Sequence, residues 1–228
     1  MHPTVHLLID MVNPLDFEGA EDLQPHALAA ARRIAVFKQR LDAAGIPTVY
    51  VNDNFGHWEL GFRELMESLR SSHAPGAQLL DFIAPNADDH FILKPKHSGF
   101  YATSLEVLLA LWGARRLILT GVAGNICVMF TANDAHMRGF RLIVPADCTA
   151  SESEALNEWA LFQMRQVMRA DTRPADRVSL RDSRTSEQHQ DEDHEQHRPE
   201  RAAGRIAPFT AVRPGRDRTD QSENQNDQ

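Results

Sequence analysis

The chain has 228 residues, a formal net charge of −8 at pH 7 and 42% hydrophobic residues. This length holds one well-packed domain, and the acidic balance argues against a nucleic-acid partner. The apolar runs are too short or too charged to span a membrane, and the first twelve residues lack the basic segment of a signal peptide. The two cysteines, Cys127 and Cys148, form no disulfide framework. We therefore expect a cytoplasmic protein that acts on a small molecule.

Short apolar stretches alternate with helical patterns along the chain. Strands are predicted at residues 5–10, 47–52, 91–94, 117–121 and 142–146, with a weak edge strand at 178–180. Continuous apolar runs of this kind are typical of strands that are covered on both faces. The alternation of strands and helices predicts an α/β fold with a mostly parallel, doubly wound sheet and helices on both of its faces.

The helices are marked by periodic apolar residues and by their expected starts. Apolar residues at helical spacing indicate helices over residues 34–44 and 62–69. Thr103 with Glu106, and Ser151 with Glu154, have the spacing of a capping box, in which each side chain bonds the backbone amide of the other residue. These pairs predict two further helices, one ending before Gly113 and one running through Val167.

The composition changes near residue 182. Residues 183–228 contain no Leu, Met, Trp, Tyr or Cys, so they cannot bury enough apolar surface to offset their ordering entropy. We expect a folded domain over residues 1–182 and a disordered polar tail over residues 183–228. His189, His194 and His197 could bind a stray metal ion, but a solvated tail without fixed geometry is favoured.

Reactive side chains follow three of the predicted strands. Asp10 ends the first strand, Lys94 ends the third, and the fourth runs into the segment GVAGNICV. Because ligands of such sheets bind at the carboxyl ends of the strands, we expect these groups to share one crevice. A partly buried Asp10 with a raised pKa would suit a general base. Lys94 directly follows an apolar run and is expected to point inward, whereas Lys96 should be solvated.

Cys127 is the residue that says most about function. It follows a glycine-containing turn at residues 121–126, and Asn125 is predicted to cap a helix that runs to Arg138. In the first turn of a helix, unpaired amides and the helix dipole favour a thiolate, and a nearby lysine would lower the thiol pKa further. The same amides could hold an oxyanion. The residues alone leave an inert buried cysteine equally open.

Three other patterns are weaker. A phosphatase-like nucleophile needs a second acid two residues after Asp10, where Val12 stands, and GVAG lacks the spacing of a dinucleotide-binding loop. Asp53 and His57 could be metal ligands, but a loop that offers Trp58 as a pocket wall is favoured because metal sites need more convergent ligands. We expect no cofactor and no metal.

Four separated segments resemble the isochorismatase-like cysteine hydrolases, a family that includes nicotinamidase-related amidases. They are IDMVNPLDFEGAEDL, VNDNFGHW, LKPKHSGFYATSLEVLL and LILTGVAGNICVMFTANDA, and the resemblance covers about residues 4–170. It implies a Rossmann-like, three-layer α/β/α fold and a catalytic triad of Asp10, Lys94 and Cys127. It also implies an oxyanion hole formed by the backbone amides of Ala123 and Cys127, often with a cis peptide bond just before Ala123.

The resemblance implies covalent hydrolysis of a small C–N substrate, an amide or a carbamoyl compound. Asp10 would take the thiol proton, Lys94 would stabilise the anionic pair, and Cys127 would attack the carbonyl to give a thioester. Asp10 would then protonate the leaving amine and activate water. Two alternatives stay open: a vinyl-ether hydrolase in which Asp10 acts directly on the substrate, and a non-catalytic small-molecule-binding relative. Vinyl-ether-cleaving members can dispense with the cysteine, so Cys127 favours the amidase.

The chain departs from the family pattern at several positions. Gly124 and Asn125 stand where many relatives have Thr and Asp, and Pro14 stands where an Asp is common. The Asp-x-His metal pattern of nicotinamidases is absent, because Phe55 occupies the second position after Asp53. These departures leave the triad intact and argue against a metal-assisted nicotinamidase.

Four aromatic residues are candidates for the substrate pocket. Phe17, Trp58, Phe100 and Tyr101 lie in the segments that follow the first three predicted strands, and they suggest a flat or aromatic ligand. The sequence does not identify the substrate, and it leaves a homo-oligomer open.

Overall fold

Six strands form the sheet at the centre of the protein. The computed structural model describes residues 2–180, and the predicted tail at 183–228 lies outside the described residues. The strands are β1 (Thr4–Ile9), β2 (Thr48–Asp53), β3 (His90–Lys94), β4 (Arg116–Val122), β5 (Arg141–Ile143) and β6 (Thr149–Ala150). The first five lie close to the predicted strands: each starts within one residue of the prediction, and all except β5 also end within one residue of it. Strands β1, β2 and β4 are almost entirely buried, as their apolar sequences predict.

The strand order defines where a ligand can bind. It is β3-β2-β1-β4-β5, with β6 pairing β4, and the pairings are parallel. The chain builds outward from β1 to β3 and then returns to add β4 on the other side of β1. The predicted doubly wound α/β fold is confirmed. In such a sheet the crevice lies at the carboxyl ends of the two strands where the direction reverses, here β1 and β4.

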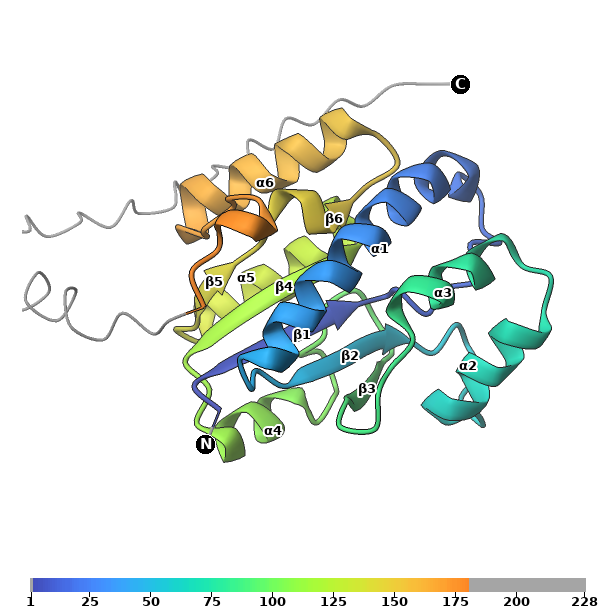
Figure 1. Cartoon of the computed structure of the whole chain (residues 1–228), viewed down its shortest axis with the longest axis horizontal. Helices are drawn as coiled ribbons and strands as arrows, with labels where there is room; N and C mark the ends of the chain where they lie inside the picture. The colour runs from blue at the N-terminus through green and yellow to red at the C-terminus, as the bar shows by residue number, and fades with distance from the viewer. Residues whose placement is uncertain (1, 181–228) are drawn as a thin grey trace, which may run out of the picture. The chain divides into compact units, whose positions relative to one another are not determined.

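Helices cover both faces of the sheet (Figure 1). They are α1 (Ala20–Ala43), α2 (Phe62–Ser71), α3 (Leu80–Ile83), α4 (Leu105–Trp112), α5 (Met129–Met137) and α6 (Glu154–Met168), with single turns η1 (Pro75–Leu79), η2 (Gly124–Val128), η3 (Ala146–Cys148) and η4 (Ala175–Arg177). One hydrophobic cluster joins the sheet to α1, α2 and α3, and a second joins it to α4, α5 and α6. The result is the expected three-layer arrangement.

Successive side chains of β1 point to opposite faces of the sheet and so belong to the two clusters in turn. Val5, Leu7 and Ile9 face the α4–α6 side, whereas Leu8 faces α1. His6 also points toward the α1 side and is fully buried, with Nδ1 3.1 Å from Thr48 Oγ1 and Nε2 2.8 Å from Thr120 Oγ1. Burial lowers the pKa of His6 to about 3, so the ring is neutral at physiological pH.

The edge strand predicted at residues 178–180 is wrong. This segment follows η4 and makes no strand pairing in the described structure. Its carbonyl groups accept hydrogen bonds from arginine side chains instead: Arg40 Nη2 donates to Val178 O at 3.3 Å, and Arg116 Nη2 donates to Leu180 O at 3.1 Å. Val178 is buried in the α1-side cluster, so the segment is held by side chains rather than by a ladder.

The two predicted capping boxes are also wrong, by one or two positions. Ser153 rather than Ser151 caps α6, and its side chain accepts a bond from Leu156 N at 3.3 Å. At α4 the capping position falls on Ser104, while the Thr103 hydroxyl accepts a bond from the next residue but one. Hydroxyl-rich segments offer several caps, and tertiary contacts decide which one is used.

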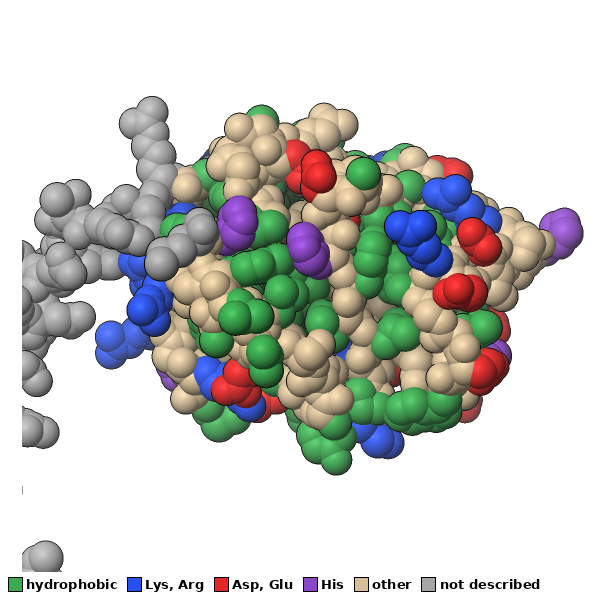
Figure 2. Space-filling model, turned by 90° about the horizontal axis from the view of Figure 1, so that it is seen from below, with side chains coloured by type: hydrophobic (Ala, Val, Ile, Leu, Met, Phe, Trp, Pro, Cys, Tyr) green, Lys and Arg blue, Asp and Glu red, His purple; other side chains and the backbone are tan. Residues whose placement is uncertain are grey.

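Several large hydrophobic side chains are exposed on the surface of the described residues. Within residues 2–180, no helix has the length and apolar character needed to cross a membrane. Figure 2 shows the face that carries α4, where hydrophobic side chains lie among charged and histidine side chains. Val107 and Leu111 of α4 are among the exposed hydrophobic side chains, at 62% and 77% of their surface.

Candidate active site

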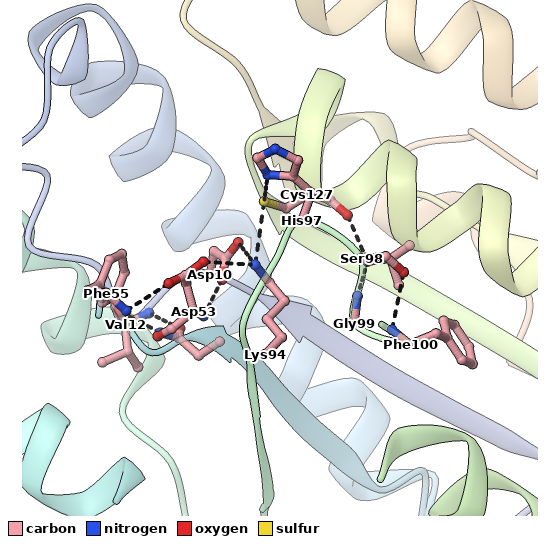
Figure 3. Close-up of polar contacts among 12 residues, drawn as sticks. Asp10, Val12, Asp53, Phe55, Lys94, His97, Ser98, Gly99, Phe100 and Cys127 are labelled. Atoms are coloured by element: carbon pink, nitrogen blue, oxygen red, sulfur yellow. Dashed lines mark hydrogen bonds and ion pairs between the residues drawn. The ribbon is translucent and has the colours of Figure 1, made fainter. Parts of the chain in front are cut away.

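Three separated elements bring Asp10, Lys94 and Cys127 together (Figure 3). Asp10 directly follows β1, Lys94 is the last residue of β3, and Cys127 lies in η2 directly after β4. Lys94 Nζ is 2.8 Å from Asp10 Oδ2 and 3.6 Å from Cys127 Sγ. The crevice at the carboxyl ends of β1 and β4 thus contains a carboxylate, an ammonium group and a thiol in mutual contact.

Asp10 is held by its backbone as well as by its side chain. Its φ of 50° lies in the left-handed region, which aspartate tolerates better than most residues. The carboxylate is almost fully buried, and Oδ1 accepts a hydrogen bond from Asp53 N at 2.7 Å. Because Oδ2 is bound by Lys94, both oxygens are fixed beside the sulfur.

Lys94 is fully buried and Lys96 is exposed, as their neighbours in the sequence predict. The Lys94 ammonium group meets three acceptors: Asp10, Cys127 Sγ and Asp53 Oδ2 at 3.7 Å. The contact with Asp53 is an ion pair beyond hydrogen-bond distance, so Asp10 and Cys127 are the nearer partners. Lys94 therefore links both carboxylates to the sulfur.

The turn that presents Cys127 depends on a glycine. Gly121 has a φ of +115°, and a Cβ atom there would lie 2.0 Å from Ile9 O. The next peptide bond, between Val122 and Ala123, is cis, as the resemblance implied. Any side chain at position 121 would push β4 away from the end of β1, so the glycine keeps the nucleophile close to Asp10.

Cys127 does not sit in a helix capped by Asn125, and this prediction is wrong. The turn η2 is a π-helix, and Ala123 O accepts bonds from Ile126 N at 3.0 Å and Val128 N at 3.2 Å. Single π-turns are often found at functional sites. Asn125 N donates to Ser151 Oγ at 3.2 Å, which explains why Ser151 is not available to cap α6.

The charge states follow from burial and from the neighbours. Burial and the Asp10 carboxylate together raise the pKa of the Cys127 thiol well above its usual range and outweigh Lys94. The raised thiol pKa contradicts the expected low-pKa thiolate. Burial also raises the pKa of Asp10. Burial alone would lower the pKa of Lys94, but the attraction of Asp10 and Cys127 outweighs it and raises the value.

A fourth group, His97, was missed by the sequence interpretation. Its Nδ1 lies 3.9 Å from Cys127 Sγ, and its ring packs against Phe130 with the centroids 5.5 Å apart. Figure 3 shows the sulfur between the Lys94 ammonium group and the His97 ring. The only signal in the sequence is its position three residues after Lys94, which did not distinguish it from the exposed Lys96.

The four predicted pocket aromatics have different locations. Phe17, Trp58 and Tyr101 are exposed, at 43%, 76% and 60% of their surface. Phe100 is buried in the α4–α6 core, and Figure 3 shows it directed away from the triad. The preceding residue, Gly99, donates its backbone N–H to Thr131 of α5, and this bond holds the start of the Phe100 segment against the core.

A different cavity is lined by Val12 and Phe55, which lie two residues after Asp10 and Asp53 in the chain, and by no residue of the triad itself. It has a volume of about 170 Å³ and none of the four predicted aromatics lines it. Its walls include Val12, Pro14, Phe55, His57, Leu65 and Leu69. Phe55 follows Asp53 closely, and its amide donates to Asp53 Oδ1 at 2.7 Å. The aromatic wall is thus Phe55, at the position where nicotinamidases would have a metal ligand.

Asp53 and His57 do not converge on a common point. Asp53 is engaged by Lys94 and by the Phe55 amide, while His57 Nδ1 is 3.4 Å from Glu59 on the surface. Across residues 2–180, no group of three or more His, Cys, Asp or Glu side chains has an arrangement that could hold a metal ion.

The sequence and the fold have counterparts in known proteins. The family model for the isochorismatase domain matches residues 4–173. The chain belongs to the isochorismatase family. It is 38% identical over 165 residues to the uncharacterized isochorismatase family protein YaaI of Bacillus subtilis (strain 168), an alignment covering 72% of this chain and 90% of YaaI.

Relatives with named activities match more distantly. Ureidoacrylate amidohydrolase RutB of Methylorubrum extorquens is 42% identical over 84 residues, 36% of this chain and 34% of that protein. N-carbamoylsarcosine amidase from Thermoplasma acidophilum superposes with a TM-score of 0.60 at 26% identity, covering 78% of this chain and 99% of that chain. The nicotinamidase SaPncA from Staphylococcus aureus has the same fold, with a TM-score of 0.58 at 21% identity over 76% of this chain and 98% of that chain. The protein is an isochorismatase-family hydrolase.

Proposed function

We propose that this hydrolase cleaves a C–N bond in a small amide or carbamoyl compound through a thioester on Cys127. The observation that carries the proposal is the contact of one buried lysine with both the carboxylate and the sulfur, at 2.8 and 3.6 Å. These distances support a mechanism in which Asp10 is the base, Lys94 the cation and Cys127 the nucleophile toward one carbonyl carbon. The relatives named for amidohydrolase activity support the same bond type.

The high pKa of the resting thiol determines the first step. Because Cys127 is protonated before substrate binds, Asp10 must take its proton as the sulfur attacks the carbonyl. Lys94 keeps Asp10 ionised beforehand and stabilises the negative charge that develops during the transfer. The backbone amides of Ala123 and Cys127 are the proposed donors to the tetrahedral oxyanion. Asp10 then gives the proton to the leaving amine, the C–N bond breaks, and water hydrolyses the thioester.

The cavity lined by Val12 and Phe55 is the proposed site for the part of the substrate that does not react. Its volume of about 170 Å³ suits a small group, and Val12, Phe55 and Leu69 give it apolar walls. His57 adds a polar group at its edge. Amides with a compact apolar or aromatic substituent should therefore be better substrates than highly charged ones.

A substrate screen tests this function. Wild-type protein is offered primary amides, N-carbamoyl compounds and isochorismate, and the release of ammonia, amine or the products of vinyl-ether cleavage is measured. The proposal expects turnover of at least one C–N substrate and a loss of about 10⁴-fold or more in Cys127→Ala. Turnover of isochorismate alone, retained by Cys127→Ala, would replace it with the vinyl-ether reaction.

A further inference from the structure

The sulfur of Cys127 has a buried side and an exposed side. On the buried side lie Asp10 and Lys94, both almost fully covered by protein. On the other side His97 Nδ1 approaches the sulfur to 3.9 Å, and the His97 side chain is exposed to solvent. His97 is therefore the neighbour of the sulfur on its solvent side.

The position of His97 is fixed relative to the nucleophile. The two residues after it are tied to α5: Ser98 Oγ donates a hydrogen bond to the Asp134 carboxylate, and Gly99 N donates to Thr131 Oγ1 at 3.0 Å. The Thr131 hydroxyl in turn donates to Cys127 O at 2.7 Å. The loop that carries His97 and the turn that carries the sulfur are thus parts of one hydrogen-bonded unit.

The second half of the reaction needs a base on the exposed side. The first half uses Asp10, whose oxygens are held by Lys94 and by the Asp53 amide. The hydrolytic water comes from solvent, whereas Asp10 is buried and both of its oxygens are already bound. The His97 imidazole is exposed and approaches the sulfur from the solvent side.

We propose that His97 is the catalytic base that activates water for hydrolysis of the Cys127 thioester, an inference that rests on the proposed function. His97 Nδ1 takes one proton from water while the water oxygen bonds to the thioester carbon. The resulting oxyanion collapses, the C–S bond breaks, and His97 returns the proton to the departing sulfur. The carboxylic acid leaves, and the thiol and the neutral imidazole are restored. Asp10 then serves only the acylation half, instead of both halves as the sequence suggested.

The lifetime of an acyl-enzyme tests this assignment directly. Full-length wild type and His97→Gln are acetylated with p-nitrophenyl acetate and desalted, and loss of the Cys127 acetyl group is followed by intact and peptide mass spectrometry. Cys127→Ala identifies any adduct elsewhere. The half-life of the acetyl group in His97→Gln should be about a hundredfold longer than in wild type, the usual contribution of a general base. Lys96→Gln and His136→Gln, which alter exposed residues of the same loop and of α5, should keep the wild-type half-life.

Hydroxylamine provides the internal control, because this stronger nucleophile does not need the base that water needs. It should release the acetyl group from wild type and from His97→Gln at similar rates, which excludes blocked access to the thioester. Equal half-lives in water for the two proteins would overturn the role of His97 and leave the thioester mechanism intact. Failure of Cys127 to form any adduct in both wild type and His97→Gln would instead overturn the proposed function, and the assignment of His97 with it.

Discussion

Lys94 determines the charge of the residues around it. Its ammonium group contacts Asp10, Asp53 and Cys127 from a fully buried position. Removing one member of a buried charge pair leaves the other uncompensated, which is costlier than losing a surface pair. A variant at Lys94 should therefore change the titration of Asp10, whereas a variant at the exposed Lys96 should not.

The pH dependence of turnover follows from the raised pKa of Asp10. Asp10 must be ionised to accept the thiol proton, so activity should rise with pH through its pKa. Because burial raises that pKa, the acid limb should lie above the ordinary aspartate value of about 3.9. Lys94→Gln should move this limb to higher pH, since the stabilising cation is lost, and Lys96→Gln should leave it in place. kcat/KM measured between pH 4 and 8 for the three proteins checks this order; a limb unchanged by Lys94→Gln would contradict it.

The sequence predicted some site residues and missed others for identifiable reasons. Asp10 and Lys94 each end a continuous apolar strand, so position alone placed them at the correct edge. Cys127 became a strong candidate only through the family resemblance. His97 could not be found, because tertiary bonds from its neighbours Ser98 and Gly99 to α5 place its ring on the sulfur. Such bonds leave no local pattern.

At the scale of elements, the junction of β1 with the turn after β4 controls the site. Gly121 is the tightest point of this junction because its Cα faces Ile9 O.

Helix starts near the site were hard to predict for a related reason. Ser151 has the sequence of a cap, but it accepts a hydrogen bond from Asn125 of η2 instead. The fold class was predictable because it depends on the alternation of apolar strands and amphipathic helices along the whole chain. The exact helix caps depend on hydrogen bonds between distant segments, which the sequence does not show.

Replacing Gly121 by alanine should therefore damage both stability and activity. The added Cβ would lie 2.0 Å from a backbone oxygen, and the φ of +115° is unfavourable for alanine. We expect a loss of about 3 kcal/mol or more in the free energy of unfolding. Gly139→Ala is the matched control, since its φ is +80° but no atom lies within 4 Å, and it should cost about 1 kcal/mol. Urea denaturation of both variants decides; equal losses would show that the close approach to β1 is unimportant.

At the scale of the whole molecule, we expect residues 174–180 to contribute more to the stability of the domain than residues 183–228. Val178 is buried against the α1-side core, and the carbonyl groups of Val178 and Leu180 are bound by Arg40 and Arg116. Truncation after Asp182 keeps these contacts, so it should leave the melting temperature and activity nearly unchanged. Truncation after Arg173 removes them and should lower the melting temperature by several degrees. A large loss of melting temperature on truncation after Asp182 would mean that residues 183–228 stabilise the domain.

Acid stability should depend on His6, far from the triad. The folded-state pKa of about 3 is lower than the ordinary value of 6.5, so only the unfolded chain binds a proton between these values. The stability that neutral His6 provides is complete above pH 6.5 and is lost as pH falls toward 3, by up to about 1.4 kcal/mol per pH unit. His6→Gln should be less stable at pH 7 but should show a smaller decline between pH 6.5 and 5. Urea unfolding at several pH values tests this; parallel declines in both proteins would contradict it.

The central claim is that Asp10 and Cys127 form one relay that cleaves a C–N bond. Its most direct test is turnover of the best amide or carbamoyl substrate by Cys127→Ala, Asp10→Asn and the double variant. Groups that act as a unit give non-additive losses, so each single variant should lose about 10⁴-fold or more, and the double variant should be hardly worse. Substantial turnover in Cys127→Ala, together with an inactive Asp10→Asn, would contradict the account and leave Asp10 acting directly on the substrate.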